Sequence, residues 1–157
     1  MSNQLSFQKV TSNEYLQTLG LIRKVFDSFI GPTYSEQGSA EFYKYIDLTT
    51  FSERQKTNHF TLVAKDQDRV VGVIEVRDFS HVAMLFVDGE YQHQGIGKRL
   101  LADALAICKN HNPDLKELTV HSSINACPIY RKLGFVAKSE EKEVNGIRFT
   151  TMGLRVG

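Results

Sequence analysis

The sequence predicts an α+β (mixed α/β) fold, with a central mixed, mostly antiparallel sheet flanked by helices on both faces. Three observations support this fold class. Apolar or alternating runs of strand length recur along the chain and are separated by amphipathic stretches of helical spacing. Three strand-like runs follow one another directly between residues 60 and 87, as antiparallel neighbours do. A strand–helix–strand order comes next, which adds a parallel pair and places helices against the sheet.

The first 58 residues predict one strand and two helices. Residues 5–10 alternate between apolar and polar, as a half-buried strand does. Apolar residues from 15 to 29 recur at helical spacing, and Gly31-Pro32 ends this first helix. A second helix is expected from about residue 38 to 46, whereas residues 49–58 are polar and give no clear pattern.

The middle of the chain predicts a hairpin, a third strand and a helix. Residues 60–65 and 70–76 are strand-like and flank a polar turn at 66–69. Residues 81–87 form the next apolar run, and a helical pattern with Leu100 and Leu101 runs over residues 96–108.

The last third predicts a strand, a short helix and a final hairpin. The strand covers residues 118–121 and the helix residues 126–132. Residues 135–142 and 147–154 are expected to pair around Asn145-Gly146, a strong signal for a type I′ turn.

Composition restricts the class of protein. We expect one domain over residues 1–157, since 41% hydrophobic and 24% charged residues are ordinary values for a globular chain. A net charge of +1 argues against nucleic-acid binding, and no apolar run has the ~20 residues of a membrane helix. Two cysteines and scattered histidines suggest neither a disulfide framework nor a metal site. The start Met1-Ser2-Asn3-Gln4 lacks the layout of a signal peptide, so we expect a cytoplasmic protein.

The segment Gln92-His93-Gln94-Gly95-Ile96-Gly97 joins the third strand of this run to the helix at 96–108. Two glycines at such a junction allow a tight turn and a close approach of the backbone to a ligand. Free amides and the helix dipole there favour an anion such as a pyrophosphate. Arg99 replaces the hydroxyl residue of a P-loop, and Leu100 replaces the third glycine of a dinucleotide loop. A Rossmann-type protein is therefore disfavoured.

This Gln-x-x-Gly-x-Gly segment resembles the acetyl-CoA loop of the GNAT superfamily of N-acetyltransferases. A second block, from Asn125 through Tyr130-Arg131-Lys132-Leu133-Gly134-Phe135, is similar to the family's later Tyr-x-Lys-Leu-Gly-Phe segment. The resemblance covers roughly residues 60 to 140. It implies a GNAT-type fold and the transfer of an acetyl group from acetyl-CoA to a primary amine.

The resemblance also implies the residues that hold acetyl-CoA. The loop amides would hold the pyrophosphate, and the edge of the strand ending at Val87 would pair with the pantetheine arm. The candidates are Leu85, Phe86, Val87, Gln92, His93, Gln94, Gly95, Ile96, Gly97, Lys98, Arg99, Asn125 and Tyr130. Lys98 and Arg99 are also compatible with a solvated helix start, and Asn125 with a helix N-cap.

Three residues are candidates for proton transfer. Tyr130 stands where the family places a general acid near the sulfur of the leaving thiolate. His81 lies eleven residues before Gln92, where one branch of the family has a base glutamate, and an imidazole suits that role near neutral pH. Glu75 and Asp78 are rivals to His81, and many members of the family pass the proton along waters instead.

The resemblance implies an acceptor site between the first two helices, where Phe29, Tyr34 and Glu36 are the candidate residues. This segment is aromatic and also carries Asp27, which suggests a small amine or an amino-acid-like acceptor. A primary amine of a small molecule and one of a peptide both stay open, and the amine is expected to attack the thioester directly. The alternative function is a non-catalytic acyl-CoA-binding module with a regulatory role. A monomer and a homodimer are both compatible with the sequence.

Overall fold

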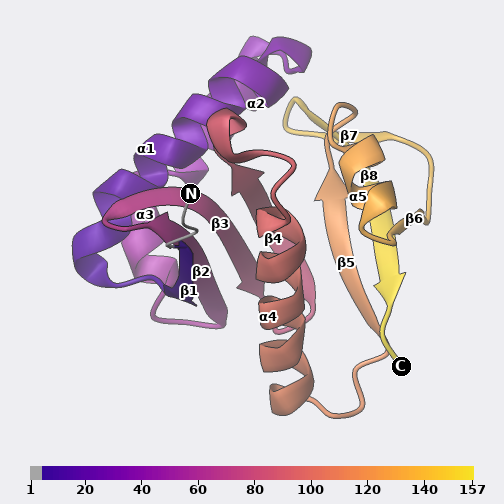
Figure 1. The fold of residues 1–157 in the computed structure, drawn as a ribbon. Helices are drawn as coiled ribbons and strands as arrows, with labels where there is room; N and C mark the ends of the chain where they lie inside the picture. The colour runs from indigo at the N-terminus through magenta and orange to yellow at the C-terminus, as the bar shows by residue number, and fades with distance from the viewer. Residues whose placement is uncertain (1–4) are drawn as a thin grey trace.

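A computed structural model describes residues 5–157 as a mixed sheet with helices on both faces (Figure 1). The expectation about a signal peptide rests on residues 1–4, which lie outside the described residues. The sheet has eight strands in the order β1-β2-β3-β4-β5-β8-β6, with β7 paired to β8. The strands are β1 (Leu5–Lys9), β2 (His59–Asp66), β3 (Arg69–Arg77), β4 (His81–Val87), β5 (Glu117–Ser122), β6 (Val136–Ala137), β7 (Lys142–Val144) and β8 (Ile147–Arg155). Only β4 and β5 pair in parallel among these strands, so the predicted fold class is confirmed.

The α-helices follow the predicted order with one addition. They are α1 (Tyr15–Val25), α2 (Glu36–Tyr45), α3 (Leu48–Arg54), α4 (Ile96–His111) and α5 (Cys127–Lys132). Helix α1 continues into a π-helical turn, Phe26–Ile30. Helix α3 lies in the stretch that gave no clear sequence pattern. It forms because Asp47 caps its first amides and because Phe51 and Arg54 are buried.

Two hydrophobic cores lie on opposite faces of the sheet, since alternate residues of a strand face opposite sides. On β3, Val71 and Ile74 pack with α4 and α5, whereas Val70 and Val73 pack with α1 and α3. The helices therefore form two outer layers around the sheet, as the sequence predicted.

The sheet opens between β4 and β5. Their parallel pairing is limited to His81 with Thr119 and Val82 with Val120, and beyond these pairs the strands diverge. Figure 1 shows the two halves of the sheet separating, with α4 in front of the opening and α5 beside β5. The second half of β4 is therefore free along the edge that faces β5.

The final hairpin extends across the molecule to α2. Asn145 and Gly146 both have positive φ, 52° and 80°, as the predicted type I′ turn requires. The Ser35 hydroxyl donates a hydrogen bond to the Gly146 carbonyl at 3.1 Å. A Cβ on Gly38 would lie 2.3 Å from that carbonyl oxygen, so only glycine allows this approach. The C-terminal hairpin thus fixes the start of α2.

None of the helices within residues 5–157 has both the length and the apolar character needed to cross a membrane.

Candidate active site

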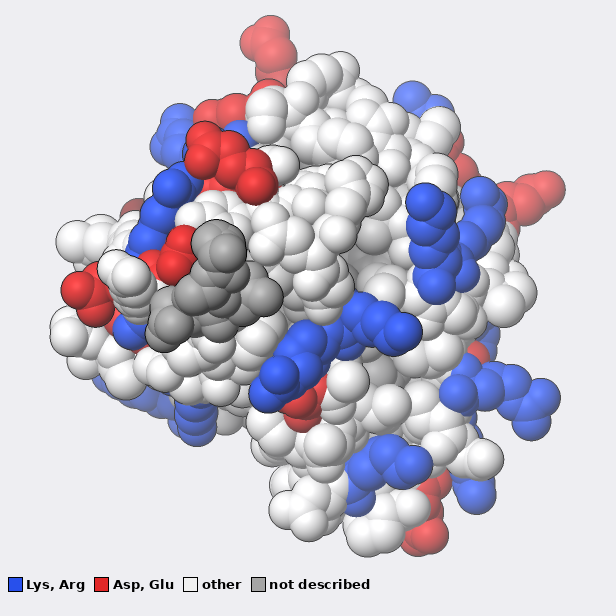
Figure 2. Space-filling view, viewed as in Figure 1, with Lys and Arg blue, Asp and Glu red and all other residues white. Residues whose placement is uncertain are grey.

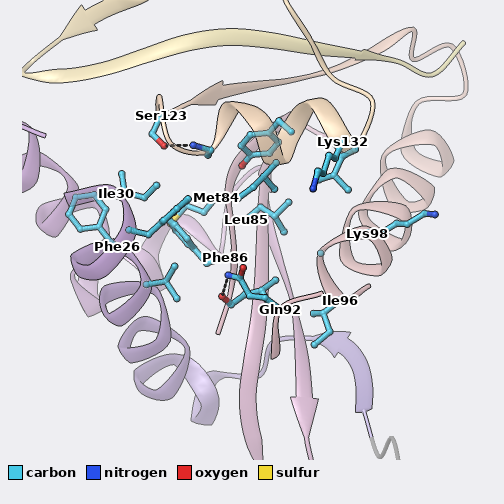
Figure 3. Close-up of a pocket in the computed structure, with 18 of the residues that line it drawn as sticks. Phe26, Ile30, Met84, Leu85, Phe86, Gln92, Ile96, Lys98, Ser123 and Lys132 are labelled. Atoms are coloured by element: carbon cyan, nitrogen blue, oxygen red, sulfur yellow. Dashed lines mark hydrogen bonds between the residues drawn. The ribbon is translucent and has the colours of Figure 1, made fainter. Parts of the chain in front are cut away.

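A cavity of about 450 Å³ occupies the opening between β4 and β5. Its walls come from the π-helical turn after α1, from α2, from the end of β4, from the loop before α4, and from α5. In Figure 3, Lys98 and Lys132 lie at one end of it and Phe26 and Ile30 at the other. Figure 2 shows the same face of the molecule hollowed in the middle, with Lys and Arg side chains to its right and below it.

The loop before α4 presents backbone amides to the cavity. His93 and Gly95 adopt left-handed conformations with φ of 64° and 79°, and Gly95 is the N-cap of α4. The first hydrogen bond of this helix runs from Arg99 N to Gly95 O at 3.0 Å, so the preceding amides have no partner within the helix. A Cβ on Gly97 would meet only Val87 Cγ2, at 3.8 Å. A Cβ on Gly95 would meet nothing within 4 Å, so neighbouring side chains do not cover this loop at either glycine.

The end of β4 is fixed by buried polar contacts. The nearly inaccessible Asp88 carboxylate accepts hydrogen bonds from Lys24 at 3.2 Å and from Arg69 at 3.1 Å. Burial alone would raise the pKa of Asp88, but the hydrogen bond from the Glu90 amide and the two cations together hold it below its usual value. The Gln92 amide donates to the Val87 carbonyl at 3.2 Å, so its side chain supports the loop from within.

Three candidate residues of β4 line the cavity. Leu85, Phe86 and Val87 pair with β3 along one edge, and along the other edge they have no pairing with β5. Strand backbone groups without a sheet partner are available to an extended ligand.

Tyr130 lies in the wall of the same cavity and is 6% exposed. Within the described chain, no protein group forms a hydrogen bond with its hydroxyl. Burial raises the pKa of Tyr130, and the nearby Cys127 and Tyr34 raise it further. The phenol therefore keeps its proton and can act as a hydrogen-bond donor towards the cavity.

Asn125 connects the two sides of the cavity. Its side-chain amide donates to the Phe29 carbonyl at 2.8 Å, which ties the loop after β5 to the turn after α1. It is not the N-cap of α5, because Ala126 occupies that position. Asn125 does not line the cavity itself.

The structure places Glu75 outside the cavity. Its carboxylate is inaccessible and accepts hydrogen bonds from Arg54 at 2.7 and 3.0 Å and from Gln55 at 2.9 Å. This arrangement does not fit the base role expected for Glu75, because the carboxylate is fully occupied in joining α3 to β3.

His81 also lies outside the cavity lining. Its Nδ1 forms a 2.7 Å hydrogen bond with the Thr119 hydroxyl, and its ring contacts His121 edge-on with centroids 4.5 Å apart. Burial, with smaller contributions from Arg77 and His121, lowers the pKa of His81 to about 4. The imidazole is thus neutral at physiological pH, one side chain away from the cavity.

His121 lines the cavity and was not among the sequence candidates. It lies two residues after Thr119 on β5, and Thr119 is in register with His81, so the three side chains share one face of the sheet. Its ring stacks on Phe149 at 4.4 Å, and burial lowers its pKa. Only the β4–β5 register reveals this pairing, and the register could not be read from the sequence.

The remaining candidates divide between the cavity and its surroundings. Phe29, Tyr34, His93, Ile96 and Lys98 line the cavity, and Glu36 does not. Gln94 and Arg99 line a separate hollow beside β1. Arg99 bonds to Asp103 at 3.0 Å and stacks over Phe7 at 4.5 Å, which matches the solvated helix start rather than a ligand contact.

Within residues 5–157 there is no cluster of three or more His, Cys, Asp or Glu side chains arranged to hold a metal ion. The two cysteines are free and buried.

Comparison with known proteins identifies the family. The model of the acetyltransferase (GNAT) domain family matches residues 30–156. The chain belongs to the GNAT family. It is 36% identical over 154 residues to the uncharacterized N-acetyltransferase YafP of Escherichia coli (strain K12), and the match covers 98% of this chain and 96% of that one.

Solved GNAT structures share the fold. A GNAT acetyltransferase from Rhodopseudomonas palustris is 25% identical with a TM-score of 0.83, covering 99% of this chain and 98% of that chain. The PaiA N-acetyltransferase of Thermoplasma acidophilum, solved in complex with coenzyme A, superposes with a TM-score of 0.80 at 20% identity. That match covers 99% of this chain and all of the other.

GNAT membership decides between the two functions that the sequence left open. The protein is an N-acetyltransferase enzyme and uses acetyl-CoA as co-substrate, rather than being a non-catalytic acyl-CoA-binding module. The residues present fit this co-substrate, because the glycine loop leaves its amides uncovered and β4 has a free edge.

Proposed function

We propose that this enzyme transfers the acetyl group of acetyl-CoA to a primary amine by direct attack of the amine on the thioester. The observation that carries the proposal is the convergence of three features on one cavity. These are the uncovered amides before α4, the free edge of β4 and the buried hydroxyl of Tyr130.

In this proposal the chain holds the co-substrate mainly through its backbone. Acetyl-CoA supplies an acetyl group activated as a thioester. The amides of Ile96, Gly97 and Lys98 face the pyrophosphate, and Lys98 adds a positive charge at the same end. The free backbone groups of β4 pair with the pantetheine arm and orient the thioester carbonyl beside Tyr130.

Tyr130 assists the departure of the thiolate. As the nitrogen–carbon bond forms and the carbon–sulfur bond breaks, negative charge develops on sulfur, and the phenol donates a hydrogen bond to it. Because burial raises the pKa of Tyr130, complete proton transfer from the phenol would be unfavourable. The proton that finally converts the thiolate to the thiol therefore derives from the amine nitrogen.

His121 is the best-placed group to receive that proton first. It lines the cavity and its pKa is lowered, so it is neutral and able to accept a proton near pH 7. His81, the base suggested by sequence spacing, stands behind His121 in edge-on contact and is held by Thr119. We propose that His81 positions His121 and does not itself receive the proton from the amine. We assign Glu75 no role in proton transfer.

The free, buried state of Cys108 and Cys127 fits the cytoplasmic setting expected from the sequence. Cys127 has no hydrogen-bonded base beside it among the described residues, so an acetyl-cysteine intermediate has no support.

Thiol release from acetyl-CoA in the presence of a panel of primary amines tests the proposed function. We expect turnover that requires both the amine and acetyl-CoA, with an N-acetylated product seen by mass spectrometry. Tight binding of acetyl-CoA without amine-dependent thiol release from any member of the panel would refute the proposal. Acetyl transfer to the protein itself before the amine is added would refute direct attack.

A further inference from the structure

We infer that the acceptor is a monoamine whose amino group is carried on an aromatic or bulky aliphatic body, with no second positive charge. This inference rests on the proposed function and narrows its substrate class. It follows from the charges and the side chains at the end of the cavity away from the lysines.

That end of the cavity is built from stacked aromatic rings. The rings of Phe26 and Phe42 lie parallel with centroids 4.1 Å apart, and Tyr34 meets Phe26 edge-on at 5.3 Å. Phe86 meets Phe42 edge-on at 6.3 Å and joins this cluster to β4. Figure 3 shows Phe26, Ile30 and Met84 together at this end. Burying an apolar ligand against such a surface favours binding, whereas a highly hydrated ligand would lose its water there without compensation.

No carboxylate lines the cavity in the part of the chain that the structure describes. Asp27, which the sequence suggested as a cation attractor, accepts a hydrogen bond from Tyr43 and lies 3.7 Å from Arg23. Glu36 at the start of α2 is likewise absent from the lining. An ammonium group buried without a counter-charge is strongly disfavoured, so a second cationic group on the acceptor would have no compensation.

The charged side chains at the other end suit the co-substrate. Lys98 and Lys132 both line the cavity, and their positive charges suit the phosphates of acetyl-CoA. Among residues 5–157, the Lys, Arg, Asp and Glu side chains that line the cavity are therefore cations only, and none of them offers a counter-charge to a second ammonium on the acceptor.

The same arrangement helps to produce the neutral nucleophile. Burial in apolar surroundings lowers the pKa of an ammonium group, as it does for a buried lysine. His121 and Ser123 supply polar atoms on the β5 side of the cavity, where one amino group can be oriented and lose its proton. A carboxylate in the lining would oppose this loss by stabilising the ammonium, and none is present among residues 5–157.

A matched pair of acceptors gives a direct test. Hexylamine and 1,6-diaminohexane share the same hexyl chain, and the diamine carries one additional terminal ammonium at pH 8. We expect kcat/KM for hexylamine to exceed that for the diamine by at least ~30-fold. We also expect 2-phenylethylamine to be acetylated about as well as hexylamine, and spermidine about as poorly as the diamine. Equal or better turnover of the diamine or of spermidine would overturn this inference and leave the proposed function standing. Turnover of no amine at all would overturn both.

A substitution in the lining tests the electrostatic cause. Phe29 lines the cavity at 38% exposure, so a charged residue there is compatible with folding. Phe29→Glu should reduce the preference for hexylamine by at least ~10-fold, whereas the neutral control Phe29→Leu should keep it. Acetyl-CoA affinity and the circular dichroism spectrum, measured for both variants, verify the fold. An identical preference in folded Phe29→Glu and Phe29→Leu would overturn the inference.

Discussion

The two ends of the cavity are built by different means. At the co-substrate end, the contacts that we propose come from the backbone of one continuous stretch, β4 and the loop that leads into α4. At the proposed acceptor end, the lining consists of side chains such as Phe26, Tyr34, Phe42 and His121, which lie on separate segments of the chain. A backbone site depends on local conformation, whereas a side-chain site depends on how distant elements pack.

This difference explains why a GNAT chain can keep its donor and change its acceptor. Backbone amides and strand edges are present whatever side chains surround them, provided that Gly95 and Gly97 leave them uncovered. The acceptor end can be altered by single substitutions in α2 or in the turn after α1. If the two ends are independent, a substitution at one end leaves binding at the other end unchanged.

The largest effect is expected from Gly97→Asp at the co-substrate end. A carboxylate at a helix start stabilises the helix, so the melting temperature should stay the same or rise. The same carboxylate occupies the space before the free amides and repels a pyrophosphate, so the Kd for coenzyme A should rise by ~100-fold. Calorimetric titration and thermal unfolding measure the two quantities.

Gly97→Ala is the matched control for that substitution. Its methyl group would meet only Val87 Cγ2 at 3.8 Å and carries no charge. We expect a change in Kd of less than about threefold, because the affinity loss in Gly97→Asp arises from charge. If the two variants lose affinity equally, the space before Gly97 does not receive a phosphate.

Tyr130→Phe should lower kcat by ~30-fold and leave the Kd for coenzyme A within about twofold. The hydroxyl has no protein partner within the described chain, so its removal breaks no structural hydrogen bond. The substitution removes a hydrogen bond to the sulfur atom at the stage in which it acquires negative charge. A ~30-fold loss in kcat corresponds to about 2 kcal/mol of transition-state stabilisation. Steady-state kinetics at saturating amine give kcat, and an unchanged value would remove Tyr130 from the mechanism.

The same division between local and distant contacts decided what the sequence could predict. The succession of strands and helices along the chain, the turn at Asn145-Gly146 and the glycine loop are local patterns, and the structure confirms them except for the added helix α3 and the division of the 135–142 strand into β6 and β7. Helix α3 was missed because its seven residues derive their stability from Asp47 as a cap and from the buried Arg54–Glu75 pair. Arg54 and Glu75 are 21 residues apart, so the periodicity of a short stretch of sequence cannot predict their contact.

Among the candidates for the base, the sequence spacing suggested His81, whereas our proposal assigns the role to its neighbour His121. Counting along one strand identified a histidine on β4 but could not show which side chains surround it. The ring contact and the parallel register with β5 place His121 against His81, and His121 rather than His81 lines the cavity. The sequence likewise suggested Glu75 as a base but could not show that Arg54 and Gln55 donate hydrogen bonds to its carboxylate.

A smaller effect tests whether the histidines behind the acceptor end stay neutral in the folded protein. Burial holds the pKa of His81 at about 4, below the ordinary histidine value near 6.5. Between these two values the unfolded chain takes up a proton that the folded chain does not, so the free energy of unfolding falls as pH decreases from 6.5 towards 4. We expect His81 to account for about 1 kcal/mol of this loss between pH 6.5 and pH 5.

His81→Gln should flatten that pH dependence, because glutamine does not titrate. Urea unfolding at several pH values measures the slope, and the slope is informative whatever the absolute stability of the variant. His59, whose pKa is also lowered by burial, remains in both proteins and gives the same background. Parallel slopes for the two proteins would show that His81 takes up its proton in the folded state.

The smallest effect should come from Asn125→Ala, which removes the link between the loop after β5 and the turn after α1. The Asn125 amide holds the Phe29 carbonyl at 2.8 Å, and both residues are exposed, so the loss of stability should be only about 0.5 kcal/mol. Since Phe29 belongs to the acceptor wall, KM for the amine should rise by about threefold while the Kd for coenzyme A stays constant. A larger change in coenzyme A affinity than in amine KM would mean that Asn125 serves the co-substrate directly, as the sequence motif first suggested. The two ends would then share a residue, and substitutions at the acceptor end could no longer be treated as independent of the donor.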